Sequence, residues 1–435
     1  MSNTPMSFAD LAIHMSSNDL GRPSTIEMDD GRLLLCGWKV FFVSHDRGLT
    51  WQESFTGKDT NGDLVESSDM SIVRLPGNGI GVHGIDLKRG YGEGSRHLFW
   101  RSQDGGQTWS PPVQINPPTM HARGFHDTMI RTSSGRLVAP FYLAMRLGPW
   151  FDRATGKLRE EDTPIDGTLL NGMFVSTSCH NWDAAFGACY TCHSDDDGRT
   201  WQPNENGYIF INWEAGSLYG SVFEPSIVEV SPRRLLMFMR TGLGRLFQSW
   251  SQDDGTTWSR PAPTNLASSH SPAQLRRMPN GHLLCIWNQQ SEEEIRRGFI
   301  RTRISTAISR NGGIIWEHFQ NLESMHEEIR VEPGPIRPTR PGSVYCFSGR
   351  IPDERHGEFV TDLPAGYTSC SYPTALVCAD RVLIRHSNSY DVNELGDRIE
   401  LDRGYKVLPL KWFYGGREPF ENLNIPKDPN APAEP

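Results

Sequence analysis

Short apolar runs, each opening on a turn, recur from one end of the chain to the other. Each turn carries Gly, Pro, Asn, Asp or Ser, and the run after it has the length of a strand, so each segment predicts a β-hairpin. The segments are 29–38, 76–84, 133–142, 231–240, 279–288 and 378–388. Six hairpins spread over the whole sequence predict an all-β protein.

Five of these hairpins are followed in the sequence by the same octapeptide, Ser-x-Asp-x-Gly-x-Thr-Trp. Its copies occupy 44–51, 102–109, 194–201, 251–258 and 309–316, and the last copy has Asn311 for Asp and Ile315 for Thr. The Asp side chain can accept backbone N–H bonds within a turn, the Gly supplies a positive φ, and the Trp can pack beneath the turn. Repeats of this period predict a β-propeller.

The repeat sets the domain organisation. The sixth hairpin has no octapeptide behind it and is followed instead by an alternating segment, 405–414. We therefore expect one six-bladed propeller over 1–435, with an insertion at about 146–185 in blade 3, another at 320–368 between blades 5 and 6, and a tail at 415–435. A seventh blade within 320–368 stays open as an alternative.

The composition is that of a globular protein, at 37% hydrophobic and 22% charged residues. No apolar run approaches the roughly 20 residues that a membrane span needs. Residues 1–30 lack the basic and apolar pattern of a secretory signal, so we expect a cytoplasmic protein. The net charge of −9 argues against a nucleic-acid partner. The eight Cys are expected to be buried thiols without an essential disulfide, and neither a metal nor another cofactor is implied.

Propeller blades are equivalent, so residues at one place relative to each hairpin should gather at one end of the central channel. About nine residues before each inner turn the chain carries polar residues. They are Arg22, Ser68 with Asp69, His126 with Asp127, Glu224, His270 with Ser271, and Ser371 with Tyr372. Such a ring suits an anionic sugar, because arginines pair with its carboxylate while other groups transfer protons or attack.

With these repeats the chain resembles the sialidase (neuraminidase) superfamily, whose repeats are called Asp boxes. The resemblance implies a six-bladed propeller, three arginines that bind the substrate carboxylate, and a tyrosine nucleophile backed by a glutamate. Gly21-Arg22-Pro23-Ser24 resembles the family's first-arginine element, although the intervening Ile is absent. The pair Glu224 and Arg240, then Arg301 eight residues before its box, and Tyr372 in TSCSYPTALV resemble the other elements. Tyr367 is the second choice for the nucleophile.

The family's acid/base aspartate, which follows the first hairpin, has no match here because 33–46 runs directly into the first box. Asp69, His126 and Asp127 are the candidates for this role, with His126 and Asp127 ranked first. The leading hypothesis is a retaining exo-glycosidase that removes a terminal acidic sugar, sialic acid or a related keto-deoxy acid, from a glycan. A polysaccharide lyase that acts on uronate-containing glycans and a non-catalytic carbohydrate-binding propeller are the alternatives.

Overall fold

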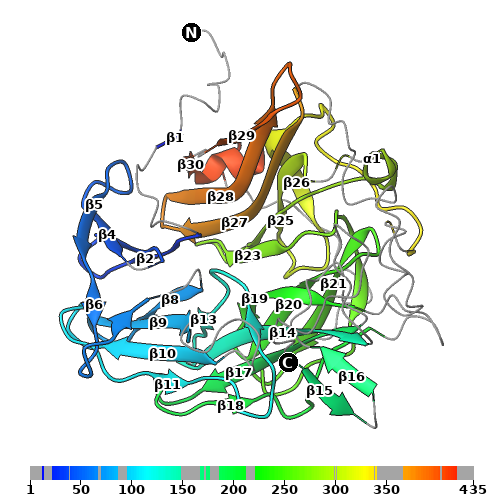
Figure 1. Ribbon diagram of the computed structural model, residues 1–435. Coiled ribbons are helices and arrows are strands. Elements are labelled where there is room, and N and C mark those ends of the chain that lie inside the picture. The colour runs from blue at the N-terminus through cyan, green and yellow to red at the C-terminus, as the bar shows by residue number, and fades with distance from the viewer. Residues whose placement is uncertain are drawn as a thin grey trace.

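Six antiparallel sheets follow one another around a common centre in the computed structural model of the chain (Figure 1). The structure describes residues 12–13, 22–38, 40–66, 70–86, 96–147, 167–170, 173–176, 186–211, 221–297, 299, 301–337, 339, 366–401 and 404–418. These residues form a six-bladed β-propeller, so the predicted fold is confirmed. Among them, no helix has the length and apolar character needed to cross a membrane.

The first three blades occupy the N-terminal half. Blade 1 consists of β2 (Ser24–Glu27), β3 (Leu33–Cys36), β4 (Phe41–Ser44) and β5 (Gln52–Phe55). Blade 2 consists of β8 (Ser71–Leu75), β9 (Gly79–Ile85), β10 (His97–Ser102) and β11 (Val113–Gln114), after a small hairpin of β6 (Gly57–Lys58) and β7 (Leu64–Val65). Blade 3 combines β12 (Arg123–Gly124), β13 (Ile130–Arg131), β14 (Leu137–Leu147), β17 (Phe186–Ser194) and β18 (Gln202–Pro203).

The other three blades complete the ring. Blade 4 consists of β19 (Phe223–Ser231), β20 (Arg234–Arg240), β21 (Arg245–Ser251) and β22 (Ala262–Ala267). Blade 5 consists of β23 (Ala273–Arg277), β24 (Leu283–Trp287), β25 (Arg303–Ser309) and β26 (Glu317–Ser324), with the short helix α1 (Glu292–Arg296) between β24 and β25. Blade 6 contains β27 (Thr368–Val377), β28 (Arg381–Val392), β29 (Arg398–Leu401) and β30 (Tyr405–Pro409).

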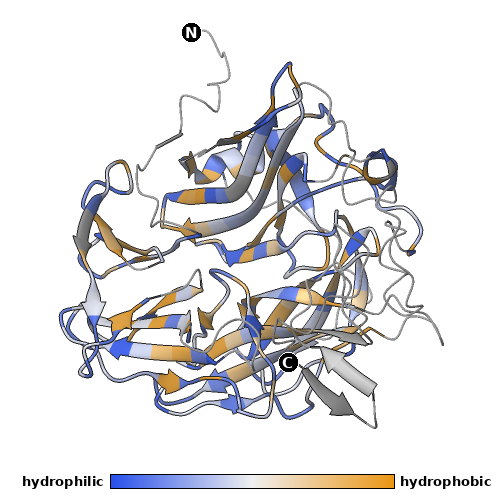
Figure 2. Cartoon of the chain, viewed as in Figure 1, coloured by the Kyte–Doolittle hydropathy of each residue, from blue (hydrophilic) through white to orange (hydrophobic). Residues whose placement is uncertain are grey.

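The core lies between neighbouring blades rather than within a single sheet. Leu34 packs in a cluster shared by blades 1 and 2, while Leu33 and Leu35 pack against blade 6. Since successive side chains of a strand point to opposite faces, a strand between two blades must be apolar on both. This accounts for the continuous apolar runs of the sequence, which appear as orange segments along the strands in Figure 2. Each pair of adjacent blades has such a cluster.

The octapeptides form the turns between the third and fourth strands of blades 1 to 5. In blade 1, Asp46 Oδ1 accepts from Ser44 Oγ and Thr50 N, both at 2.8 Å, and Gly48 N donates to Ser44 Oγ at 2.8 Å. Gly48 has φ 92°, and Trp51 Nε1 donates to its carbonyl at 3.2 Å. The equivalent Ser, Asp or Asn, and Gly contacts recur in the other boxes, so the predicted turn role of the octapeptide is confirmed. The Trp contact recurs in all but the fourth box, where Trp258 Nε1 donates to Thr191 Oγ1 at 3.0 Å.

Blade 6 lacks a box because of how the propeller closes. Its outermost strand is β1 (Ala12–Ile13), which pairs antiparallel with β30. No turn joins the third and fourth strands there, so no box is needed. The segment 405–414, expected to be one alternating strand, divides into β30 and the 3₁₀-helix η5 (Leu410–Tyr414), which begins after Pro409 and ends at Gly415 with φ 67°.

The two expected insertions are described in part. The hairpin of β15 (Gly167–Leu170) and β16 (Met173–Ser176) pairs with the end of β14 within 146–185. The first residues of 320–368 belong to β26, the fourth strand of blade 5.

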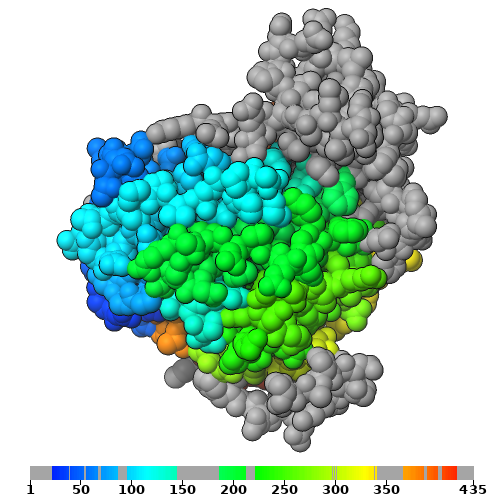
Figure 3. All heavy atoms as spheres, turned by 90° about the horizontal axis from the view of Figure 1, so that it is seen from below, coloured from blue at the N-terminus to red at the C-terminus, as the bar shows by residue number. Residues whose placement is uncertain are grey.

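Figure 3 shows the surface of blades 2 to 4, in cyan and green, from below. Because strands alternate in direction within a blade, the boxes lie at the end of the propeller opposite to the starts of the innermost strands.

Candidate functional site

Two arginines meet at the ring of Tyr372. Tyr372 lies in β27, the innermost strand of blade 6, and only 9% of its surface is exposed. The guanidinium carbon of Arg22, just ahead of β2, lies 4.3 Å from the centre of the ring. That of Arg301, just ahead of β25, lies 5.0 Å from it. Both cations are within the range in which a guanidinium interacts with an aromatic face, so three blades supply one cluster.

Arg240 and Glu224 form a buried ion pair beside this cluster. Arg240 ends β20 and is fully buried, and its Nη1 lies 2.6 Å from Oε2 of Glu224 in β19. Burial acts to lower the pKa of Arg240, but Glu224 first and Tyr372 next outweigh burial and raise it. Arg240 pairs in the strand register with Phe223, whose ring centre lies 6.0 Å from that of His270, and the His270 carbonyl lies 3.5 Å from Nη2 of Arg301. The residues predicted for the carboxylate site therefore lie together.

The backbone is unusual where these side chains arise. Asp127, Glu224 and Tyr372 have φ of 55°, 44° and 57°, although none is glycine. The strand register shifts at two of them, between Phe223 and Ser226 and between Ser371 and Pro373. Such bulges redirect a side chain, and each positive φ costs about 1–3 kcal/mol. The equivalent positions inferred from the sequence thus share a backbone conformation in three blades.

His126 lies against the nucleophile candidate. Its ring centre is 5.4 Å from that of Tyr372, and 1% of the residue is exposed. Burial, followed by the charge of Arg22, lowers the pKa of His126 well below its ordinary value, against a hydrogen bond to the Tyr372 backbone. The imidazole is therefore neutral near pH 7. Its Nε2 has no hydrogen-bond partner among the residues that the structure describes.

Asp127, the other leading acid candidate, is held by three blades. Its Oδ1 accepts from Ser24 Oγ at 2.6 Å, and its Oδ2 accepts from Ala375 N at 3.1 Å and pairs with Arg276. Burial raises the pKa of Asp127, while Arg276 acts to lower it. Because both oxygens are engaged within the protein, these contacts favour a structural role over proton donation to a substrate.

The remaining candidates are placed differently. Asp69 lies outside the described residues. Tyr367, the second choice for the nucleophile, is buried between the rings of Phe299 and Tyr390, each at 6.1 Å. That packing favours Tyr372 as the reactive tyrosine. Arg276 was missed by the sequence analysis, because an arginine near a strand end carries no signal that it pairs with a residue in another blade.

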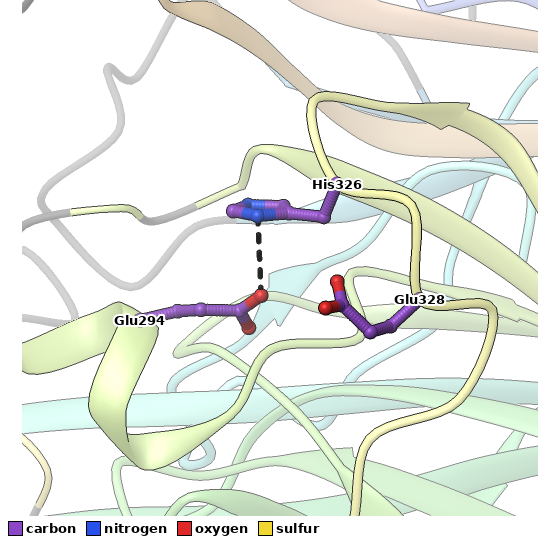
Figure 4. Close-up of side chains that lie close together, drawn as sticks. All are labelled: Glu294, His326 and Glu328. Carbon is purple, nitrogen blue, oxygen red and sulfur yellow. Dashed lines mark ion pairs between the residues drawn. The ribbon is translucent and has the colours of Figure 1, made fainter.

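A second charged cluster, Glu294, His326 and Glu328, has the ligand types of a metal site (Figure 4). The buried guanidinium of Arg303 already lies 2.9 Å from Glu294 Oε1 and 3.8 Å from Glu328 Oε2. His326 contacts Glu294 through Nδ1 at 3.3 Å and Thr302 through Nε2 at 2.8 Å. Arg303 thus supplies the positive charge, and we assign no metal to this cluster.

The chain resembles known proteins both in its sequence, through a family model, and in its fold, through solved structures. The family model described as "BNR repeat-like domain" matches residues 80–384. The Hadza microbial sialidase Hz136 has a TM-score of 0.51 at 15% identity, over 92% of this chain and 68% of that one. Its likeness shows the fold alone. No curated protein sequence matches.

Two further solved structures give TM-scores of 0.49. The Trypanosoma rangeli sialidase has 13% identity over 91% of this chain and 55% of its own. The NanB sialidase of Streptococcus pneumoniae has 11% identity over 92% and 70%. The chain thus spans about half the length of the trypanosomal structure.

Proposed function

The chain belongs to the BNR repeat-like domain family, and we propose that it is an exo-acting glycoside hydrolase that releases a terminal acidic sugar from a glycan. The sugar is sialic acid or a related keto-deoxy acid. The observation that carries the proposal is the meeting of Arg22 and Arg301 at the ring of Tyr372, with the Arg240–Glu224 pair beside them. Arginines bind a carboxylate through paired hydrogen bonds, which suits a sugar acid.

A tyrosine is a fitting nucleophile for such a sugar. The anomeric carbon bears the carboxylate, so a charged Asp or Glu would be repelled, whereas a neutral phenol would not. In the proposed reaction Tyr372 Oη bonds to the anomeric carbon, its proton passes to Glu224, and the glycosidic oxygen leaves. Water then cleaves the tyrosyl-sugar bond, and two displacements retain the configuration.

The leaving oxygen needs a proton, and we assign its donor to His126. Burial first, and the charge of Arg22 next, lower the pKa of His126 and keep the imidazole neutral in the free protein. A sugar carboxylate bound by Arg22 offsets that positive charge, which raises the pKa of His126 and allows it to bind the proton that it then donates.

One observation favours a second candidate function. A neutral, buried imidazole whose Nε2 has no hydrogen-bond partner within the described part of the chain is also suited to abstract a proton next to a carboxylate, as in β-elimination by a polysaccharide lyase. In that reaction the arginines neutralise a uronate. His126 would take the proton, a C=C bond would form as the glycosidic C–O bond breaks, and the departing oxygen would receive the proton from His126, so that no water is consumed.

Two substrates separate these functions. Incubation with a fluorogenic sialoside is expected to release the fluorophore and the free sugar. Uronate-terminated oligosaccharides would instead develop the ultraviolet absorbance of an unsaturated uronate if the protein is a lyase. If neither signal appears while acidic oligosaccharides still bind, the hydrolase proposal is wrong and a non-catalytic carbohydrate-binding propeller takes its place.

A further inference from the structure

Asn288 lies at the centre of a hydrogen-bond network beneath the candidate site. It directly follows β24 and is fully buried. Its Oδ1 accepts from Ser271 Oγ at 2.6 Å, and its Nδ2 donates to the carbonyls of Arg303 at 2.9 Å and Cys370 at 2.8 Å. Its own carbonyl accepts from Ser269 N at 3.2 Å. One side chain thus ties together three separate segments.

Each of these segments carries a group of the site. Ser269 and Ser271 enclose His270, whose carbonyl lies 3.5 Å from Nη2 of Arg301. Arg303 follows Arg301 by two residues, and Cys370 precedes Tyr372 by two. The segments are also joined directly, because Cys370 N donates to the Arg301 carbonyl at 2.8 Å. Asn288 therefore bonds to residues two positions away from the proposed binding cation, Arg301, and from the proposed nucleophile, Tyr372.

Arg301 and Tyr372 both need such support. Their φ values of 60° and 57° lie in the left-handed region, where a residue other than glycine persists only if its surroundings hold it. An amide meets the need because it offers an acceptor to Ser271 and two donors to the two carbonyls. A carboxylate of the same shape would instead face both carbonyl oxygens with an acceptor.

We propose that Asn288 is the positioning residue of this site, setting the Arg301 guanidinium and the Tyr372 ring in register with each other. The inference deepens the proposed function and rests on it for the identity of the reaction. The placement of Tyr372 by Asn288 holds whatever that reaction is.

The test compares Asn288→Asp with Gln289→Glu. Gln289 is the adjacent residue and equally buried; its amide donates to Ser305 Oγ and the Ile329 carbonyl, both at 3.0 Å, and accepts from Val331 N at 2.8 Å. The two changes add the same charge and remove the same number of donors. Both residues contact β25, Gln289 through Arg303 and Ser305, but of the two side chains only that of Asn288 is bonded to Ser271 and Cys370.

Two readouts on the full chain are needed. With a fluorogenic sialoside we expect kcat to fall about 100-fold in Asn288→Asp and less than about threefold in Gln289→Glu, since a misplacement near 1 Å costs about that much. With 3-fluorotyrosine at position 372, the ¹⁹F resonance is expected to shift or broaden in Asn288→Asp alone. Both variants are expected to lose similar amounts in Tm.

The outcomes separate the two proposals. If the wild type releases no acidic sugar, the proposed function fails, while the ¹⁹F spectrum still tests Asn288. An unchanged ¹⁹F resonance in folded Asn288→Asp, or one that moves equally in Gln289→Glu, overturns the positioning role. Should Asn288→Asp not fold, Ser271→Ala, which removes a single hydrogen bond, decides the question by the same spectrum, with a smaller shift expected and no shift contradicting the proposal.

Discussion

Both ends of the propeller contain left-handed backbone positions, but the two ends differ in the residues that occupy them. Each box turn has two successive left-handed positions: the second is glycine in all five boxes, as at Gly48 and Gly255, whereas the first is Arg47, Asp197 or Asp254 in three of them. The surrounding side chains repeat from blade to blade. At the other end, equivalent positions of the innermost strands also have positive φ, but they carry Asp127, Glu224 and Tyr372. At that end the three blades share a backbone conformation, but each has a different residue there.

The difference separates structure from chemistry. A box is the same in every blade because each box performs the same task, which is to close a turn. At the channel end, three different non-glycine residues have positive φ, and we interpret this strain as retained for the sake of their particular side chains. We therefore expect changes at the channel end to affect chemistry and buried charge, and changes at the box end to affect folding alone.

The largest expected effect comes from Tyr372→Phe. Loss of the phenolic oxygen removes the proposed nucleophile, so release of the fluorophore from a sialoside should fall about 10³-fold or more with little change in Tm. Tyr367→Phe is the matched control, because that tyrosine is as buried but stacks on other rings. Glycosidase activity that survives in Tyr372→Phe contradicts the mechanism, while a lyase that depends on His126 would keep most of its activity.

The second effect is on stability. Arg240→Met leaves the Glu224 carboxylate buried without its cation, and we expect the free energy of unfolding to fall by about 3–5 kcal/mol. The double change Arg240→Met with Glu224→Gln should recover part of this loss. At the box end, Arg47 pairs with Asp380 on the surface, and Arg47→Met should cost less than about 1 kcal/mol. Urea denaturation measures both, and equal losses would contradict the distinction between the two ends.

The box end was predictable from sequence because its contacts are local. Ser44, Asp46 and Gly48 lie within a few residues of one another, so the octapeptide contains its own hydrogen-bond partners. The gathering of Arg22 and Tyr372 was also predictable, since equivalent blades place equivalent residues at the same end of the channel. Their roles as binder and nucleophile remain predictions.

Contacts between distant segments were not predictable. Asp127 binds Ser24, Arg276 and Ala375, each from a different blade. These residues are far apart in the sequence, so no local sequence pattern predicts that they are in contact. The closing strand β1 spans only Ala12–Ile13, too short for an apolar period to be recognised. The bonds of Asn288 likewise depend on which blades become neighbours.

The blade without a box offers a third test, at acid pH. Glu323 of blade 5 lies 2.7 Å from Lys406 and 3.1 Å from His386, both in blade 6. Burial acts to raise the pKa of Glu323, but His386 and Lys406 outweigh it and lower the pKa from 4.5 to about 2. A carboxyl whose pKa is lower in the folded state stabilises the protein above its unfolded pKa. This stabilisation is lost as the pH falls from 4.5 towards 2.

Glu323→Gln should therefore lower the free energy of unfolding by on the order of 2–3 kcal/mol at pH 6, with a smaller deficit at pH 3. Urea denaturation at several pH values measures the difference between wild type and variant. A deficit that stays constant across this range would mean that the link between blades 5 and 6 does not depend on the charge of Glu323.

The smallest effect tests the backbone comparison itself. Both Tyr372→Ala and Tyr372→Gly remove the ring, so the difference between their unfolding free energies isolates the cost of a positive φ. We expect the glycine variant to be more stable by about 1–2 kcal/mol, since that is the cost of a left-handed conformation for a residue with a Cβ. Gly255→Ala should lose a similar amount at the box end, where the added Cβ would lie 3.3 Å from Leu235 Cδ1. If Tyr372→Ala is as stable as Tyr372→Gly, the channel end is not strained, and the contrast between the two ends reduces to their side chains.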